Sequence, residues 1–196
     1  VGISVAIALP ARVVRSTHDG PTLDYYDQYH ALNRQLNDIV TTAAEFLRVR
    51  GYRAFAQTTD AVREFGIYRT ALPHKTVATR AGIGWVGKSA LLVTEAYGSA
   101  VRISSLTTNA PLPCAVPVTV SYCGNCTRCV DACPAQALKG IAWTPQVDRD
   151  KLVDPIACRQ KARALTKLWI GQEESLCGKC MEVCPYTQKY LASIQG

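Results

Sequence analysis

Residues 123–134 read CGNCTRCVDACP, and this stretch decides how the C-terminal part of the chain folds. Cys123, Cys126 and Cys129 follow one another at steps of three residues, which lets their thiolates surround one [4Fe–4S] cube. Cys133 stands before Pro134, and in this spacing the fourth cysteine points to a different cluster. The stretch therefore predicts two clusters and a chain that moves electrons.

A second cysteine run, CGKCMEVCP at residues 177–185, repeats the first imperfectly. It has one cysteine fewer, and Cys158 on the preceding basic helix is the natural replacement. Each site obtains four ligands when the two runs exchange a cysteine, as in two-cluster ferredoxins. We assign Cys123, Cys126, Cys129 and Cys184 to cluster one, and Cys133, Cys158, Cys177 and Cys180 to cluster two.

Two other uses of the cysteines explain the spacing less well. Zinc ribbons use two CxxC pairs and give no role to a third cysteine at the same step. Disulfides would leave one of the nine cysteines unpaired. Cluster thiolates need a reducing compartment, so we expect a cytoplasmic protein. Cys114 is left over, and we expect a buried free thiol there, with a labile ligand or redox thiol as the alternative.

The composition is that of a globular protein. Of 196 residues, 48% are apolar and 19% are charged. Apolar stretches such as Val5–Leu9 are too short to cross a bilayer, no signal peptide is visible, and we expect no membrane association. The chain starts without methionine inside a strand-like segment, so we expect a missing N-terminal piece.

The formal net charge of +7 invites an anionic partner such as RNA, an acidic redox protein or a phosphate-bearing cofactor. Two clusters with their thiolates would reduce the charge to about +3. A mildly basic solvated surface is therefore the simpler interpretation.

Hydrophobic periodicity and turn residues divide the chain into two parts. Three prolines in residues 109–120 indicate a linker, so we predict domains at 1–113 and 114–196. The first part mixes helices and strands, and the second contains the cysteines. Strands are predicted at Ser4–Leu9, Tyr52–Ala56, Leu91–Val93 and Val101–Thr107, and helices at Leu23–Arg50, His74–Ala81 and Pro155–Ile170.

Residues 82–89, GIGWVGKS, fit both the dinucleotide pattern GxGxxG and the Walker pattern GxxxxGKS. Both motifs place a phosphate at a helix N-terminus after a buried strand. Here a helix-like segment precedes the glycines and a strand-like segment follows them, so a nucleotide site is disfavoured. The glycines still permit close backbone approach to a flat or bulky group.

Residues 74–89, HKTVATRAGIGWVGKS, together with Tyr97-Gly98 and the first cysteine run, resemble epoxyqueuosine reductase, a cobalamin- and iron–sulfur-dependent relative of the reductive dehalogenases. The resemblance runs from about Ser4 to Tyr186. It implies an α+β fold, with an α/β corrinoid-type domain of the nitroreductase or dehalogenase kind at 1–113 and a double-cluster bacterial ferredoxin-like domain at 114–196. It also implies a corrinoid beside Lys75, Gly84, Trp85, Gly87, Lys88 and Ser89.

Three departures from this family affect the predicted function. Gln57 stands where the family has an acidic proton donor, so the catalytic residue is unknown. The segment from Thr59 to His74 is longer than in the family, and Tyr68 or Asp60 there would reshape the pocket. The family's C-terminal tRNA-binding repeat domain is missing, which suggests a short form. We therefore do not expect tRNA as a partner.

We predict an iron–sulfur oxidoreductase that passes electrons through two [4Fe–4S] clusters to its own or a partner's corrinoid, or to a small substrate. One alternative is a two-cluster electron-transfer and docking protein without its own cofactor. Others are an ATP-driven activator that uses Gly82–Ser89, and an epoxyqueuosine (tRNA) reductase. The expected partners are an electron donor of the ferredoxin or flavodoxin type and a corrinoid protein.

Overall fold

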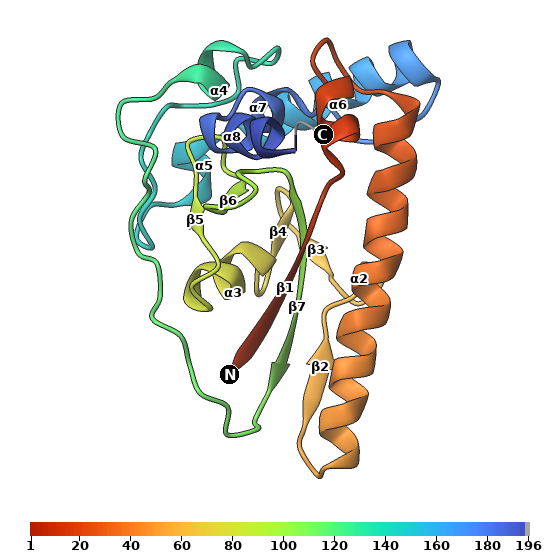
Figure 1. Ribbon diagram of the computed structural model, residues 1–196, viewed down its shortest axis with the longest axis vertical. Coiled ribbons are helices and arrows are strands. Elements are labelled where there is room, and N and C mark those ends of the chain that lie inside the picture. The colour runs from red at the N-terminus through yellow and green to blue at the C-terminus, as the bar shows by residue number, and fades with distance from the viewer. Residues whose placement is uncertain (195–196) are drawn as a thin grey trace.

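The computed structural model describes residues 1–194 and centres on an antiparallel sheet of three strands (Figure 1). Strand β7 (Val101–Thr108) lies in the middle, between β1 (Gly2–Ala8) and β2 (Ala54–Ala56). Residues paired across an antiparallel sheet share a face. Ile3 pairs with Leu106 and both belong to the core on one face, so Gly2, paired with Thr107, lies on the other.

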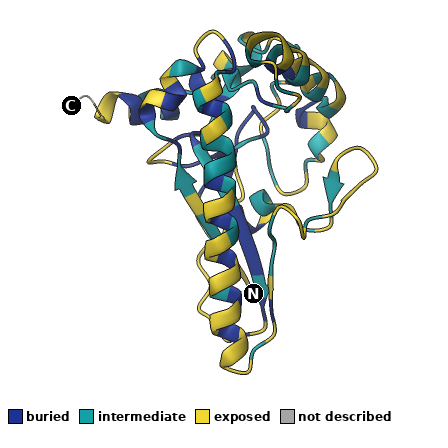
Figure 2. Cartoon of the chain, turned by 90° about the vertical axis from the view of Figure 1, so that its right-hand side faces the viewer, coloured by how far each residue is buried: buried dark blue, intermediate teal, exposed yellow. Residues whose placement is uncertain are grey.

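The long helix α2 (Leu23–Val49) covers the first face of the sheet. Thr22 caps its N-terminus by accepting a hydrogen bond from the backbone N–H of Tyr25. Its buried side chains recur every three or four residues and pack on β7 and β2, whereas its outward turns are mostly exposed (Figure 2). The helix ends before Gly51, whose φ of +84° suits a left-handed terminal residue.

The short helix α3 (His74–Arg80) covers the opposite face. It approaches β1 closely, because a Cβ atom at Gly2 would lie 2.8 Å from the side chain of Val77. Two small hairpins accompany the sheet. One is formed by β3 (Glu64–Phe65) and β4 (Arg69–Thr70), and the other by β5 (Trp85–Val86) and β6 (Leu92–Val93).

Residues 109–121 contain no helix or strand and run from the end of β7 back along the molecule to the cysteine-rich part (Figure 1). That part is built from short helices around one longer helix. They are α4 (Arg128–Asp131), α5 (Arg149–Leu152), α6 (Pro155–Ile170), α7 (Lys179–Glu182) and α8 (Pro185–Ser193). None of the helices among the described residues is both long and apolar enough to cross a membrane.

The two halves of the chain share their cores. Val13 and Val14 of α1 (Ala11–Ser16) pack in one cluster with Met181 and Leu191. Val86 and Ala90 belong to a second cluster with Ala137, Leu138, Leu152 and Val153. The predicted division at residue 113 stays a prediction, but the two parts are packed together rather than loosely linked.

Most predicted elements are confirmed, including the strand near Ser4–Leu9, the helix at Leu23–Arg50 and the helix at Pro155–Ile170. Helix α1 was missed because its sequence, ARVVRS, is short and ends in polar, turn-rich residues. The segment from Thr59 to His74 contains the β3–β4 hairpin. The strands predicted around residues 92 and 101 exist, yet β6 pairs with β5 and β7 pairs with β1 and β2.

Gly98 is where the α/β part meets α8, and it provides a test of that packing. Its φ is +56°, and a Cβ atom would collide with the backbone nitrogen of Thr187. Gly51 also has positive φ, but a Cβ atom there would meet nothing within 4 Å beyond its chain neighbours. We expect Gly51→Ala to cost about 1–2 kcal/mol of unfolding free energy from backbone strain. Gly98→Ala should cost roughly 1–3 kcal/mol more from overpacking, measured by denaturant titration. Equal losses of unfolding free energy in the two variants would show that the contact between Gly98 and Thr187 adds no packing constraint.

Candidate functional site

The cysteines of the two runs come together where α4 contacts α7. Cys129 lies on α4 and Cys180 on α7, while Cys184 is the N-cap residue of α8. All nine cysteines lie within the described residues and all are free thiols. The alternative of structural disulfides therefore receives no support from the fold.

The thiols predicted for cluster one are electrostatic neighbours. The pKa of Cys129 is raised to about 11, mainly by burial and in addition by the charges of Cys123, Cys184 and Cys126. The important member of this set is Cys184, because it comes from the second cysteine run. The exchange of ligands between the two runs is thus supported by the way the chain folds.

The thiols predicted for cluster two form a second neighbourhood. Burial raises the pKa of Cys158, and the nearest charges that add to this effect are those of Cys133 and Cys177. Burial likewise raises the pKa of Cys180. The charges of four neighbouring thiols raise it as well, namely those of Cys177, Cys158, Cys129 and Cys133. Thiols crowded in this way become thiolates only beside a strong positive charge, which cluster iron supplies. The individual ligand assignment stays a prediction.

Within residues 1–194, no three Cys, His, Asp or Glu side chains converge tightly enough to hold a single metal ion. The four thiolates of an iron–sulfur cube bind four different irons and stand further apart than the ligands of one ion. This result therefore leaves the cluster assignment untouched.

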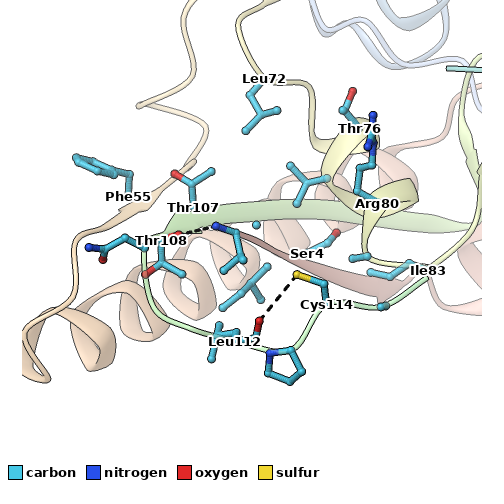
Figure 3. Close-up of a pocket in the computed structure, with 18 of the residues that line it drawn as sticks. Ser4, Phe55, Leu72, Thr76, Arg80, Ile83, Thr107, Thr108, Leu112 and Cys114 are labelled. Atoms are coloured by element: carbon cyan, nitrogen blue, oxygen red, sulfur yellow. Dashed lines mark hydrogen bonds between the residues drawn. The ribbon is translucent and has the colours of Figure 1, made fainter. Parts of the chain in front are cut away.

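Cys114 belongs to neither neighbourhood. It is exposed in the proline-containing segment, with its Sγ atom 3.9 Å from the carbonyl oxygen of Leu112 (Figure 3). The prediction of a buried thiol was wrong, because this segment runs over the surface and packs few side chains on Cys114.

The 82–89 loop connects the α/β part to the first cysteine run through Lys88. Its Nζ atom donates hydrogen bonds to the carbonyl oxygens of Gly124, at 2.8 Å, and Cys126, at 3.1 Å. Lys88 is buried, with 8% of its surface exposed. The residue that the Walker pattern would direct to a phosphate therefore holds the loop that carries Cys123 and Cys126.

The glycines of this loop are explained largely by contacts within the protein. A Cβ atom at Gly84 would collide with the carbonyl of Val93, and one at Gly87 would lie 2.7 Å from the Val93 side chain. After Ser89 the chain enters β6, so no helix begins at this loop. The predicted corrinoid contacts of Gly84, Trp85, Gly87, Lys88 and Ser89 stay predictions.

Lys75, the remaining residue predicted to contact a corrinoid, reaches the same loop from α3. Its Nζ atom donates to the carbonyl oxygen of Ala90 at 2.5 Å. Burial lowers the pKa of Lys75 to about 8, and the positive charge of Arg149 acts in the same direction. This ammonium group is therefore a stronger acid than that of an ordinary lysine.

A row of three polar side chains crosses the α3 face of the sheet. Gln57 donates through Nε2 to the hydroxyl of Ser105, and that oxygen lies 2.8 Å from Nδ1 of His74. The sequence pointed to Gln57, but Ser105 and His74 were missed as site residues. The pairing of β2 with β7, which places Gln57 beside Ser105, is the feature that unites them.

Burial lowers the pKa of His74, and the charge of Arg102 lowers it further. At neutral pH the ring is therefore uncharged. The Ser105 hydroxyl accepts from Gln57 and has a proton of its own, which it can give to Nδ1 of the neutral ring; in that tautomer the ring proton is on Nε2.

A cavity of about 860 Å³ adjoins this polar row on the α3 side of the sheet (Figure 3). Its walls come from the first residues of β1, the end of β7, α3 and residues 112–115. Ser4 lines it beside Ser105, its partner across the sheet, and the Ser4 hydroxyl has no hydrogen-bond partner. The lining contains no predicted cluster ligand and no predicted corrinoid contact.

The β3–β4 hairpin is held against the cysteine-rich part. Arg69 contacts Asp148 and Asp150, each at 2.8 Å. The guanidinium group of Arg159 lies 4.3 Å from the centre of the Tyr68 ring. Tyr68 thus packs against α6, and neither it nor Asp60 lines the cavity of about 860 Å³; their effect on the predicted corrinoid pocket stays a prediction.

Comparison with known protein families identifies the cysteine-rich part. Residues 122–187 match the family described as a 4Fe-4S double cluster binding domain. This segment is similar to the double-cluster domains. The prediction of two [4Fe–4S] clusters is thereby confirmed.

The whole chain was also compared with curated proteins and solved structures. It is 32% identical to the epoxyqueuosine reductase of Lactococcus garvieae over 171 residues, which are 83% of this chain and 42% of that protein. An epoxyqueuosine reductase solved with an epoxyqueuosine-modified tRNA-Tyr stem loop is 25% identical, with a TM-score of 0.61, covering 95% of this chain and 48% of the other. The resemblance to the epoxyqueuosine reductases is confirmed. The chain spans less than half the length of these relatives.

The fold is also similar to that of a reductive dehalogenase, whose structure suggests a mechanism for B12-dependent dehalogenation. The matched region covers 99% of this chain and 28% of the dehalogenase, with a TM-score of 0.69. Its identity of 18% shows the fold alone. The mixed α/β fold of the dehalogenase and epoxyqueuosine reductase kind is therefore confirmed.

One prediction is corrected by these comparisons. We did not expect tRNA as a partner, yet the region shared with this chain belongs to a reductase solved with a tRNA stem loop. The prediction was wrong because it drew a conclusion from where the given sequence ends, and that position is no evidence against a substrate.

Replacing a ligand tests the exchange between the runs. We expect Cys184→Ser to reduce the iron content from about eight to about four per chain, because only cluster one loses a thiolate. Cys114→Ser should retain about eight irons. Iron and sulfide analysis of anaerobically prepared protein provides the measurement. Loss of the cluster bound by Cys177 and Cys180 in Cys184→Ser, with the other retained, would contradict the assignment.

The lowered pKa of His74 predicts a pH dependence of stability. The unfolded chain binds this proton more readily than the folded chain, so the stability due to neutral His74 is present above about pH 6.5 and is lost below it. The melting temperature should fall more between pH 7.5 and 6 for the wild type than for His74→Gln, which can still bond to Ser105. Parallel melting curves for the two proteins would refute this prediction.

Proposed function

We propose that this chain is the electron-delivering part of an iron–sulfur oxidoreductase that reduces epoxyqueuosine in tRNA. The observation that carries the proposal is the direct contact between a double-cluster domain and an α/β part with epoxyqueuosine reductase-like sequence, made by Lys88 and the first cysteine run. Curated relatives that share this region bear that activity in their name.

The arrangement of the side chains supports a direction for the electrons. Cys180 feels the charge of Cys129, so the two cysteine neighbourhoods adjoin each other. The first neighbourhood also contacts the 82–89 loop, since a Cβ atom at Gly87 would lie 3.6 Å from Sγ of Cys123. Electrons that enter at cluster two would therefore pass to cluster one and leave towards the α/β part.

A corrinoid in the α/β part would supply a cobalt ion that takes up these electrons and passes them to the substrate. The fit of the predicted residues is partial, because Gly84, Gly87 and Lys88 are occupied by contacts within the protein. Trp85 supports it, since its buried indole nitrogen has no hydrogen-bond partner. Trp85, together with the N–H donors of Lys75 that its bond to Ala90 leaves free, would thus hold the group.

Protons must accompany the electrons. Removing the oxygen of an epoxide as water consumes two electrons and two protons. Gln57 cannot supply a proton, because an amide is not an acid at neutral pH. His74 is linked to Gln57 through Ser105 and has a titratable ring, so it is the residue of the row that can hold and move a proton.

Gln57 also favours a second candidate, an electron-transfer protein that has no substrate of its own. An amide that bonds to Ser105 preserves the structure of the row while omitting the acid. Mixing the protein with cobalamin distinguishes the candidates, because a changed corrin spectrum supports the reductase and an unchanged one supports the carrier.

Restoring the acid tests the reductase directly. The clusters are reconstituted without oxygen, cobalamin and a low-potential reductant are added, and conversion of an epoxyqueuosine-containing tRNA stem loop is followed by mass spectrometry. We expect turnover by the wild type and an increase of up to about 10²-fold in Gln57→Asp, the lower end of the gain from general acid catalysis. Gln57→Asn is the control without an acid. No turnover by either the wild type or Gln57→Asp, with both clusters present, would reject the proposal.

A further inference from the structure

Lys88 is one of two lysines of the described residues that are withdrawn from solvent, and the other, Lys75, bonds to the carbonyl oxygen of Ala90 rather than to the cysteine run. The other six lysines, all within the described residues, are exposed or partly exposed. The hydrogen bonds at Nζ of Lys88 go to two backbone carbonyls of the first cysteine run. No carboxylate of residues 1–194 forms an ion pair with it. Burying a positive charge costs free energy unless a negative group nearby compensates it.

The first cysteine run provides that negative group. Carbonyl dipoles satisfy two protons of the ammonium group but leave its net charge uncompensated. The thiolates of Cys123 and Cys126, joined to a cluster, carry negative charge beside the carbonyls that Lys88 contacts. Because Lys88 itself is buried, its attraction to these thiolates is screened less than an attraction between two exposed charges.

The second neighbourhood lacks an equivalent cation. Lys179 and Lys161 are the positive groups that act on Cys177. Lys161 is exposed, and Lys179 lies 3.7 Å from the carboxylate of Glu182, which offsets its charge. The two cluster sites therefore differ in their electrostatic surroundings although their cysteine patterns are similar.

We propose that Lys88 raises the reduction potential of cluster one above that of cluster two and so makes cluster one the exit for electrons. Reduction adds one negative charge to a cluster, and a nearby buried cation stabilises the reduced form. One electron leaves reduced cluster two, which becomes oxidised, and reduces cluster one, while a low-potential one-electron donor replenishes cluster two. The inference rests on the electron delivery proposed above, but its test needs neither corrinoid nor tRNA.

The experiment is a redox titration of the two clusters by electron paramagnetic resonance, with dithionite as the donor. Lys88→Met removes the charge and the hydrogen bonds, whereas Lys88→Gln removes the charge and keeps one donor. Iron analysis first selects samples with both clusters. In each variant we expect the equilibrium constant for reduction of the higher-potential cluster, cluster one, to fall at least about tenfold, which lowers its potential by about 59 mV for one electron. The potential of cluster two should stay unchanged.

Two controls separate charge from structure. Lys88→Arg keeps the charge and should preserve the potential. Arg128→Gln removes an exposed cation next to Cys129, and screening by water should make its effect smaller. Unchanged potentials in Lys88→Met and Lys88→Gln would overturn the proposal, as would an equal shift in Arg128→Gln. If only Lys88→Arg retains both clusters, Lys88 is a structural anchor and the proposal fails.

Discussion

The structure depends on holding the first cysteine run against the α/β part. Lys88 makes this contact with hydrogen bonds to the carbonyls of Gly124 and Cys126. Carbonyls in a loop that turns around a cluster point in several directions, and few side chains can reach two of them. A flexible ammonium group with three donors can do so, provided that its charge is compensated nearby.

Apolar packing extends this single contact over the whole interface. Leu138 and Val153 join Val86 in one core, and Leu191 joins Val14 in another. A redox centre needs such rigidity, since the spacing between electron carriers must not fluctuate. Gly98 serves the same purpose at this interface, because it allows its backbone to approach Thr187 of α8 where a methyl group would not fit.

The polar row shows how a changed residue can preserve a structure and alter its chemistry. Gln57 has the shape of a glutamate, but its amide donates a hydrogen bond to Ser105, where a carboxylate would accept one. It has no ionisable proton, so another residue must supply the proton, and His74 is the candidate. The inserted β3–β4 hairpin is a separate change, secured by Arg69 against the cysteine-rich part rather than in the cavity.

The sequence by itself determined the two clusters, the long helix α2 and the helix α6, because ligand spacing and hydrophobic periodicity are local properties. It also located Gln57 through its neighbours in the chain. Only the tertiary structure decided that Lys88 contacts the cysteine loop, that Ser105 joins Gln57 to His74, and that Cys114 is exposed. Those facts depend on strand pairing and on packing between segments far apart in sequence, which a local pattern does not encode.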